Sequence, residues 1–87
     1  MVKTNDKYGF IDQQGRIVIP IQYDDASSFS EGLAMVKTND KYGFINKQGD
    51  FVIQPRFDDA WPFFKGLAKV QIKGKWFHID KQGNRLP

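Results

Sequence analysis

The chain of 87 residues has a mass of 10.1 kDa, 13 basic and 10 acidic side chains, a formal net charge of +3 and no cysteine. This length fits one small domain, and the lack of cysteine excludes a disulfide scaffold, a thiol nucleophile and a thiolate zinc site. Hydrophobic residues make up 40% and aromatic residues 15% of the chain, which excludes a disordered tail.

The chain shows no sign of export or of a membrane span. Its first ten residues, MVKTNDKYGF, are polar where a signal peptide needs an apolar core. No stretch approaches the roughly 18 apolar residues that a membrane helix requires. We therefore expect a cytoplasmic location by default and no membrane partner.

A repeat of 34 residues dominates the sequence. Residues 2–11, VKTNDKYGFI, recur unchanged as residues 36–45, and residues 2–35 share 21 identities with residues 36–69. This identity indicates a recent duplication or an assembly from one parental repeat. A third, more divergent copy begins at Val70. We divide the single domain into units of about residues 1–32, 33–66 and 67–87.

Each unit is predicted to form three antiparallel strands. In the second unit these are residues 33–38, 41–46 and 50–53, which are rich in β-branched and aromatic residues. Asn39 and Asp40 favour a two-residue type I′ turn between the first two strands, and Gly49 suits the left-handed position of a bulged turn before the third. The third strand of the last unit is expected to end at about Arg85. The fold class is therefore all-β, a tandem repeat of three three-stranded antiparallel meanders, with partial propeller blades as the alternative arrangement.

Two connectors, residues 21–32 and 55–66, are expected to be irregular. They contain prolines, glycines and the Asp pairs 24–25 and 58–59, which break strands and can start short helical turns. The Asp pairs lack the alternating oxygen ligands of a calcium loop. We expect them to cap backbone N–H groups instead.

The predicted register gives each sheet two different faces. Ala34 should lie opposite Ile45 and Val36 opposite Gly43. Across the bulge, Ile45 should lie opposite Phe51 and Gly43 opposite Ile53, which makes one face apolar. The other face is mixed, and in the second and third units it carries Leu33, Met35, Lys37, Tyr42, Phe44, Val52, Leu67, Lys69, Gln71, Trp76 and His78. Its aromatic residues fit two interpretations, packing between units or an exposed binding surface.

The repeat carries a recognisable motif. Tyr8-Gly9-Phe10-Ile11, Tyr42-Gly43-Phe44-Ile45 and Lys75-Trp76 are each followed by Gln-Gly, and the first two also by a Val-Ile strand, Asp-Asp-Ala and Gly-Leu-Ala. This pattern resembles the bacterial WG (KWG) repeat family over essentially the whole chain. Tyrosine replaces the signature tryptophan in the first two copies, and Phe77 stands where the third copy should have glycine. We expect Gly9 and Gly43 to make room among bulky core residues. The resemblance implies a non-catalytic interaction or surface-array module.

No arrangement of side chains predicts an enzyme or a cofactor. His78 is the only histidine, and it stands where the other copies have Phe10 and Phe44. No phosphate-binding glycine loop, dinucleotide fingerprint or zinc-ligand spacing is present. We therefore predict no enzymatic activity, no metal and no cofactor.

The charge is concentrated in the third copy. Residues 65–87 have a net charge of +5 and residues 1–64 a net charge of −2. The lysines can keep the end of the array from pairing with other chains, bind an acidic protein, or follow phosphates while aromatic rings stack on bases. The main hypothesis is a protein-interaction module: a small binder or inhibitor, or a piece of a longer array.

The alternative hypothesis is a nucleic-acid binder that uses the basic third copy. The candidate contact residues are Lys69, Lys73, Lys75, Trp76, His78, Lys81, Tyr42 and Tyr8. The oligomeric state is left open, because free strand edges could join chains.

Overall fold

The computed structural model describes all 87 residues and contains ten β-strands and no helix. The strands are β1 (Val2–Thr4), β2 (Lys7–Ile11), β3 (Ile17–Tyr23), β4 (Asp25–Ala26), β5 (Ala34–Thr38), β6 (Lys41–Ile45), β7 (Phe51–Phe57), β8 (Asp59–Ala60), β9 (Ala68–Ile72) and β10 (Lys75–Ile79). They form three antiparallel sheets, with strand orders β1-β2-β3, β4-β5-β6-β7 and β10-β9-β8. The predicted all-β repeat architecture is confirmed.

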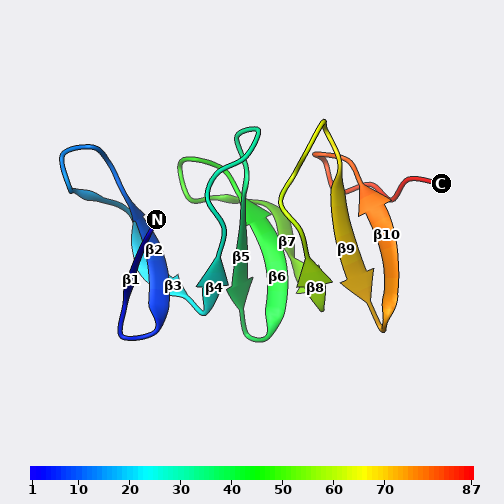
Figure 1. Ribbon diagram of the computed structural model, residues 1–87, viewed down its shortest axis with the longest axis horizontal. Helices are drawn as coiled ribbons and strands as arrows, with labels where there is room; N and C mark the ends of the chain where they lie inside the picture. Colours follow the sequence, from blue (N-terminus) through cyan, green and yellow to red (C-terminus); the bar gives the residue numbers. More distant parts are fainter.

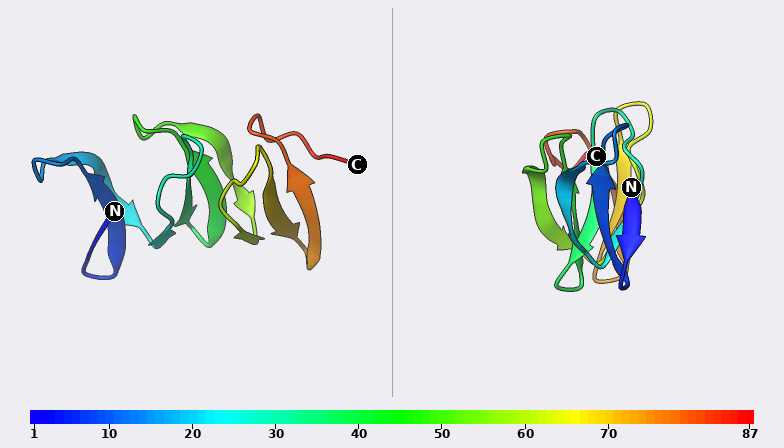
Figure 2. Two further views of the ribbon diagram at one scale, coloured as in Figure 1. Left: turned by 45° about the horizontal axis from the view of Figure 1, so that its top comes forward. Right: turned by 90° about the vertical axis from the view of Figure 1, so that its left-hand side faces the viewer.

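The three sheets follow one another along the longest axis of a molecule that measures 42 × 24 × 16 Å (Figure 1). Viewed along that axis, they lie one behind another (Figure 2). The third meander is the least complete, because its last strand is reduced to a single bridge between Ile79 and Arg85. No helix has the length and apolar character of a membrane span.

The hairpin turns have the predicted geometry. Asn39 and Asp40 both have positive φ, 52° and 65°, as a type I′ turn requires. The resulting register places Ala34 opposite Ile45 and Val36 opposite Gly43. Short polar side chains tolerate the left-handed conformation, so the local sequence sets the pairing of the first two strands.

The predicted register of the third strand is correct at its start, where Ile45 lies opposite Phe51, and wrong further along. Phe44, not Gly43, lies opposite Ile53, and Tyr42 lies opposite Phe57, so that β7 bulges by two extra residues. Pro55 lies within this bulge, on an edge strand where its missing N–H breaks no ladder bond. The strand therefore continues through the proline to Phe57, beyond the predicted end at residue 53.

The bulge explains the signature glycine better than the predicted side-chain crowding does. A Cβ atom on Gly43 would lie 2.7 Å from the carbonyl oxygen of Ile53 and 2.8 Å from the backbone nitrogen of Pro55. Gly9 is equally close to the backbone of Ile21. The third strand thus folds its backbone over the glycine, and any side chain there would push the strand away.

The connectors contain strands rather than the short helical turns that were expected. β4 and β8, at the Asp-Ala positions, pair with β5 and β9 of the following sheet. Each connector therefore leaves one sheet and becomes the edge of the next. This pairing, together with packing between the sheets, ties successive repeats together.

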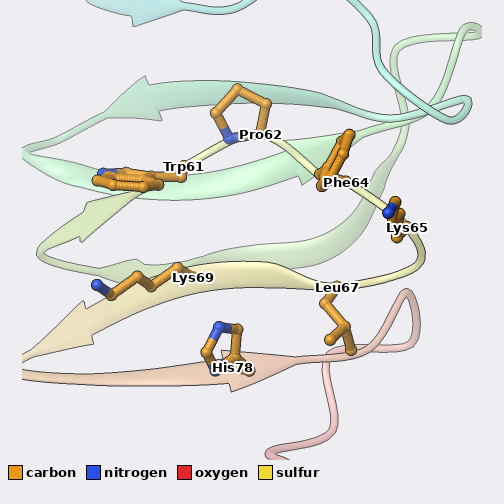
Figure 3. Close-up of a pocket in the computed structure, with 7 residues that line it drawn as sticks. All are labelled: Trp61, Pro62, Phe64, Lys65, Leu67, Lys69 and His78. Carbon is orange, nitrogen blue, oxygen red and sulfur yellow. The ribbon is translucent and has the colours of Figure 1, made fainter.

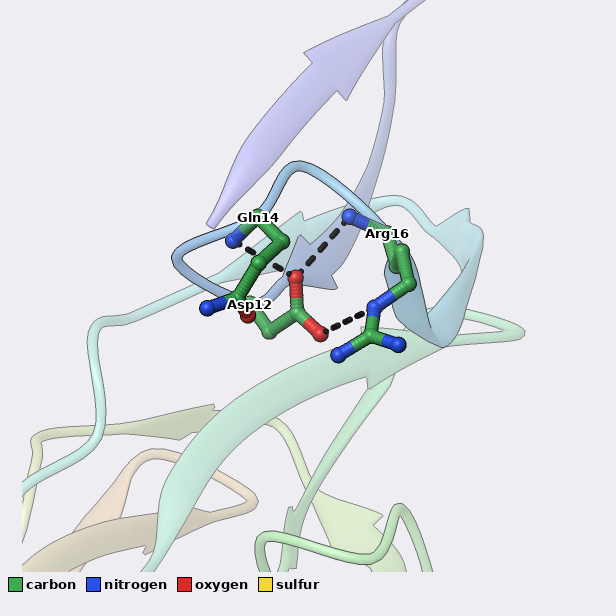
Figure 4. Close-up of polar contacts among 3 residues, drawn as sticks. All are labelled: Asp12, Gln14 and Arg16. Atoms are coloured by element: carbon green, nitrogen blue, oxygen red, sulfur yellow. Dashed lines mark hydrogen bonds and ion pairs between the residues drawn. The ribbon is translucent and has the colours of Figure 1, made fainter.

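A side chain also organises the turn that precedes the third strand of each repeat. The Asp12 carboxylate accepts the backbone N–H groups of Gln14 and Arg16, both at 2.9 Å, and pairs with the Arg16 guanidinium at 3.0 Å (Figure 4). Asn46 and Asp80 accept the equivalent backbone bonds in the other two repeats. The acidic or amide residue three positions before the glycine is therefore a turn former.

The hydrophobic core lies between the sheets. This agrees with the first of the two interpretations of the aromatic residues, which was packing between units. One cluster joins the first and second sheets and consists of Phe10, Ile19, Tyr23, Ala26, Ala34, Val36 and Ile45. A second cluster joins the second and third sheets and consists of Leu33, Tyr42, Phe44, Ile53, Phe57, Ala60, Phe63, Ala68, Val70 and Ile79. The middle sheet is thus buried on both faces, and each end sheet on one.

Candidate functional site

The candidate site is the face of the third sheet that points away from the second, here called the outer face. Ala68, Val70 and Ile79 point inward and are buried. Residues next to them, including Lys69 and His78, point to the opposite side, where Lys69 and His78 face each other across β9 and β10. The strand alternation therefore gathers the polar and aromatic residues of the third copy on one surface.

The outer face contains an open hollow of about 320 Å³, here called the outer hollow (Figure 3). Its walls come from the second connector, from β10 and from β9 with the residue preceding it. The lining residues are Trp61, Pro62, Phe64, Lys65, Leu67, Lys69 and His78. No aspartate or glutamate lines it, so its polar rim is basic.

Several large apolar side chains around the outer hollow remain in contact with solvent. Phe64 is 70% exposed and Trp61 is 56% exposed. Trp76 and Leu67 are more than one third exposed. Such a cluster on one face of a small protein differs from single exposed apolar residues and is typical of an interaction surface.

Lys69 links the two tryptophans of the chain. Its Nζ lies 5.1 Å from the ring centroid of Trp61 and 5.2 Å from that of Trp76. The two indole rings are 6.1 Å apart and pack edge to face. The lysine is thus held by cation–π contacts, which fix an ammonium group beside the outer hollow.

The tip of the second connector supplies the other cation. Lys65 adopts a left-handed φ of 52°, and its Nζ lies 5.3 Å from the ring centroid of Phe64. This contact places the ammonium group over the ring, while Lys65 remains exposed to solvent. Lys65 and Lys69 therefore stand at different edges of the same hollow.

The remaining candidate lysines do not join this site. Lys73 lies in the β9–β10 turn, where its backbone N–H donates to Asp58 at 2.7 Å, and the exposed Lys75 follows this turn. Lys81 lies 3.5 Å from Glu31 of the first connector. Of the candidate residues, the structure brings together Lys69, Trp76 and His78.

The two tyrosine candidates pack between sheets. Tyr42 is only 9% exposed, and its hydroxyl group donates a hydrogen bond of 2.9 Å to Asp25. Burial, the hydrogen bond to Asp25 and the nearby carboxylates raise the pKa of Tyr42 to about 12. Tyr8 is half-buried against the first cluster. Neither position resembles the exposed setting of Trp76.

The carboxylates hold the repeats together. Asp58 forms an ion pair with Lys41 and accepts the Lys73 backbone N–H, and these contacts lower the pKa of Asp58. Glu31 accepts the Gly66 backbone N–H at 2.8 Å, which lowers the pKa of Glu31 with a smaller contribution from Lys81. No group of three metal-ligating side chains is present. Asp25, Asp58 and Asp59 accept backbone N–H groups, as the sequence predicts, whereas Asp24 forms an ion pair with Lys7 instead.

Five residues of the outer hollow were not among the sequence candidates: Trp61, Pro62, Phe64, Lys65 and Leu67. A comparison of the two connectors contains a signal for those that differ between the repeats, although not for Leu67, whose equivalent Leu33 is identical. Ser27, Ser30 and Glu31 of the first connector become Trp61, Phe64 and Lys65 in the second. Between otherwise similar repeats, this change from small or acidic residues to aromatic and basic ones coincides with the exposed face of the third sheet.

These features define a tandem β-repeat array with buried inner faces and an open aromatic end. The family model described as the WG containing repeat matches residues 8–42 and 42–76, each window running from one signature aromatic residue to the next. Because these windows cover most of the chain, the protein belongs to the WG-repeat family. No curated protein and no solved structure matches the chain.

Proposed function

We propose that this chain is a non-enzymatic protein-interaction module that binds its partner through the outer face of the third repeat. The observation that supports this proposal most strongly is the contrast between equivalent positions. Leu33 and Phe44 are 7% and 0% exposed, whereas Leu67 is 39% exposed and His78 is also exposed. A face that is otherwise used for packing is thus exposed in the third repeat.

The composition of this face also suits a protein partner. Tryptophan is enriched at the residues that contribute most binding energy in protein interfaces, and both tryptophans of the chain lie here. The lysines at the rim would favour a partner with an acidic surface. The proposal keeps the cytoplasmic location expected from the sequence.

Nucleic-acid binding is the alternative, and the lysine between the two indoles is the feature that favours it. Against it, Lys69 already lies over one face of each indole ring, which reduces the ring surface left for a base to stack on. Lys73, Lys75 and Lys81 also lie away from the outer hollow, so the lysines do not form one phosphate-binding track. A titration of labelled oligonucleotide at two salt concentrations tests this alternative, because several phosphate contacts require a steep salt dependence.

The interaction proposal is tested by removing the apolar surface of the outer face. In the variant Trp61→Ser with Phe64→Ser, both positions receive the residues of the first connector. The matched control, Val18→Thr with Val52→Thr, removes apolar surface that is 49% and 44% exposed in the other repeats. Immobilised wild type and control should retain a specific partner from native lysate, and the outer-face variant should lose it. Equal capture by all three proteins would contradict the proposal.

A further inference from the structure

The inner interfaces of the array share one contact that shows what the outer hollow could hold. Each connector inserts a phenylalanine against the aromatic residue of the preceding repeat. The ring of Phe29 lies 4.9 Å from that of Phe10, and the ring of Phe63 lies 4.8 Å from that of Phe44, measured between centroids. Phe63 is 1% exposed, so this insertion is complete at the second interface.

The outer hollow is the same site one repeat further along the chain. His78 and Leu67, which line it, are equivalent to Phe44 and Leu33, which belong to the cluster around Phe63. A phenylalanine ring therefore has a pre-formed place beside Leu67 and His78. The hollow of about 320 Å³ is large enough for one such side chain.

The polar surroundings of this site differ from those of the inner one. At the second interface, the Ser30 hydroxyl group donates to the carbonyl oxygen of Phe63 at 2.6 Å, and Glu31 accepts the Gly66 N–H. At the outer hollow, Phe64 and Lys65 replace Ser30 and Glu31. The carboxylate of Glu31, which accepts a hydrogen bond at the inner interface, is thus replaced by the cationic side chain of Lys65 at the outer hollow.

In an inference that rests on the proposed function, we propose that the outer hollow binds an acidic segment of a partner protein. This segment inserts a phenylalanine side chain into the hollow. The ring replaces the insertion made by Phe63 at the inner interface. Carboxylates on either side of the ring pair with Lys65 and Lys69, since no acidic residue of the chain lines the hollow. The shape of the outer hollow thus favours the phenylalanine ring, and its positive charge favours acidic residues on either side of that phenylalanine.

A second copy of this chain does not meet these requirements. Phe64 is the only phenylalanine among the large exposed hydrophobic residues, and it is part of the lining itself. The exposed residues of the first sheet include Ile11 and Ile17, which are aliphatic. A second copy therefore offers no free phenylalanine to insert.

The chain provides both a probe and a reporter for this proposal. A peptide of residues 22–32, QYDDASSFSEG, combines one phenylalanine with three acidic residues and has no tryptophan. Both tryptophans of the protein lie at the outer hollow or next to it, with ring centroids 6.1 Å apart. Tryptophan fluorescence during a titration with this peptide therefore reports on the site directly.

Three matched comparisons then test the ring and the charges. The peptide with Phe29→Ala should bind roughly tenfold or more weakly, because the anchor is lost. The peptide with Asp24→Asn, Asp25→Asn and Glu31→Gln should also bind more weakly, and added salt should have less effect on it. Lys65→Glu in the protein should weaken binding of the acidic peptide roughly tenfold, whereas Lys47→Glu, an equal charge change in the second repeat, should have less than about a twofold effect.

Several results would overturn the proposal: no saturable fluorescence change, equal binding of the Phe29→Ala peptide, or equal effects of Lys65→Glu and Lys47→Glu. Sedimentation of the protein alone gives a further outcome. Dimers that dissociate on Lys65→Glu would identify a second copy as the occupant instead. If the lysate capture depends on Trp61 and Phe64 while the peptides fail to bind, the proposed function stands and this inference about the partner's chemistry fails.

Discussion

The second and third repeats use the same strand pattern for different purposes. In the second repeat, Phe44 is completely buried under the connector that follows, whereas its equivalent in the third repeat, His78, is exposed. The difference follows from neighbours rather than from local structure, since β6 and β10 pair with β5 and β9 in the same register. In a repeat array, the residues that form a strand are thus different from the residues that decide whether the face of that strand is buried or exposed.

The largest expected difference between the two faces concerns their contribution to stability. Phe44→Ala should lower the free energy of unfolding by about 3–5 kcal/mol, because it removes a buried ring from the cluster between two sheets. His78→Ala at the equivalent exposed position should change it by less than about 0.5 kcal/mol. Chemical denaturation followed by circular dichroism measures both.

Similar losses in the two variants would mean that the third sheet is covered on its outer face. The substitution His78→Phe provides the complementary control. It makes the outer face resemble the inner one, yet it should leave the free energy of unfolding nearly unchanged, because no sheet covers the new ring. A clear stabilisation by His78→Phe would therefore contradict the comparison.

The position of the signature glycine allows a second comparison of the two repeats, which concerns the backbone. Gly43→Ala should lower the free energy of unfolding by about 1–3 kcal/mol, because the new Cβ atom would meet the backbone of Ile53 and Pro55 at under 3 Å. In the third repeat, Phe77 takes this position and packs 6.4 Å from the ring of Phe57. Phe77→Gly should therefore destabilise the protein as well, through lost packing, and thermal unfolding of both variants checks the pair.

The sequence predicted those parts of the fold that depend on local residue types. Asn39 and Asp40 set the hairpin and its register. The repeat showed that the aromatic residues recur, but left open whether they pack between units or form a binding surface. The two-residue bulge of β7 was missed because Pro55 was read as the end of a strand, although an edge strand tolerates it. Local patterns do not report which strands lie at an edge.

The candidate site could be predicted only in part for the same reason. Lys69, Trp76 and His78 share a face by strand alternation, which the sequence reveals. Trp61 and Lys65 reach that face from a connector whose path depends on β8 pairing with the following sheet. Tyr42 looked equivalent to Trp76 in sequence, and only the presence of a neighbouring sheet distinguishes them.

Tyr42 and Trp76 also differ in how they should respond to pH. Tyr42→Phe should cost about 1 kcal/mol at neutral pH, because it removes the hydrogen bond to Asp25. The pKa of Tyr42 is raised to about 12, so the unfolded state loses this proton first, near pH 10, and the native state is destabilised between about pH 10 and 12. The stability of the wild type should thus fall more steeply than that of Tyr42→Phe in this range, and parallel pH profiles would contradict the assignment.

The smallest expected effect concerns the two connector tips, where Glu31 and Lys65 occupy equivalent positions. Glu31→Gln should lower the melting temperature less than Tyr42→Phe does, because the carboxylate that accepts the Gly66 N–H is well hydrated. The hydrogen bond lowers the pKa of Glu31 below its usual 4.5, so its contribution is present at neutral pH and is lost as the pH falls below that value. Melting curves of wild type and Glu31→Gln should therefore differ at pH 7 and converge at acidic pH, once the pH falls below the lowered pKa of Glu31. Lys65→Gln provides the control, because its tip faces the outer hollow. Its melting temperature should match that of the wild type at pH 7 and at acidic pH. A decrease as large as that of Glu31→Gln would show that the second tip also holds a neighbour.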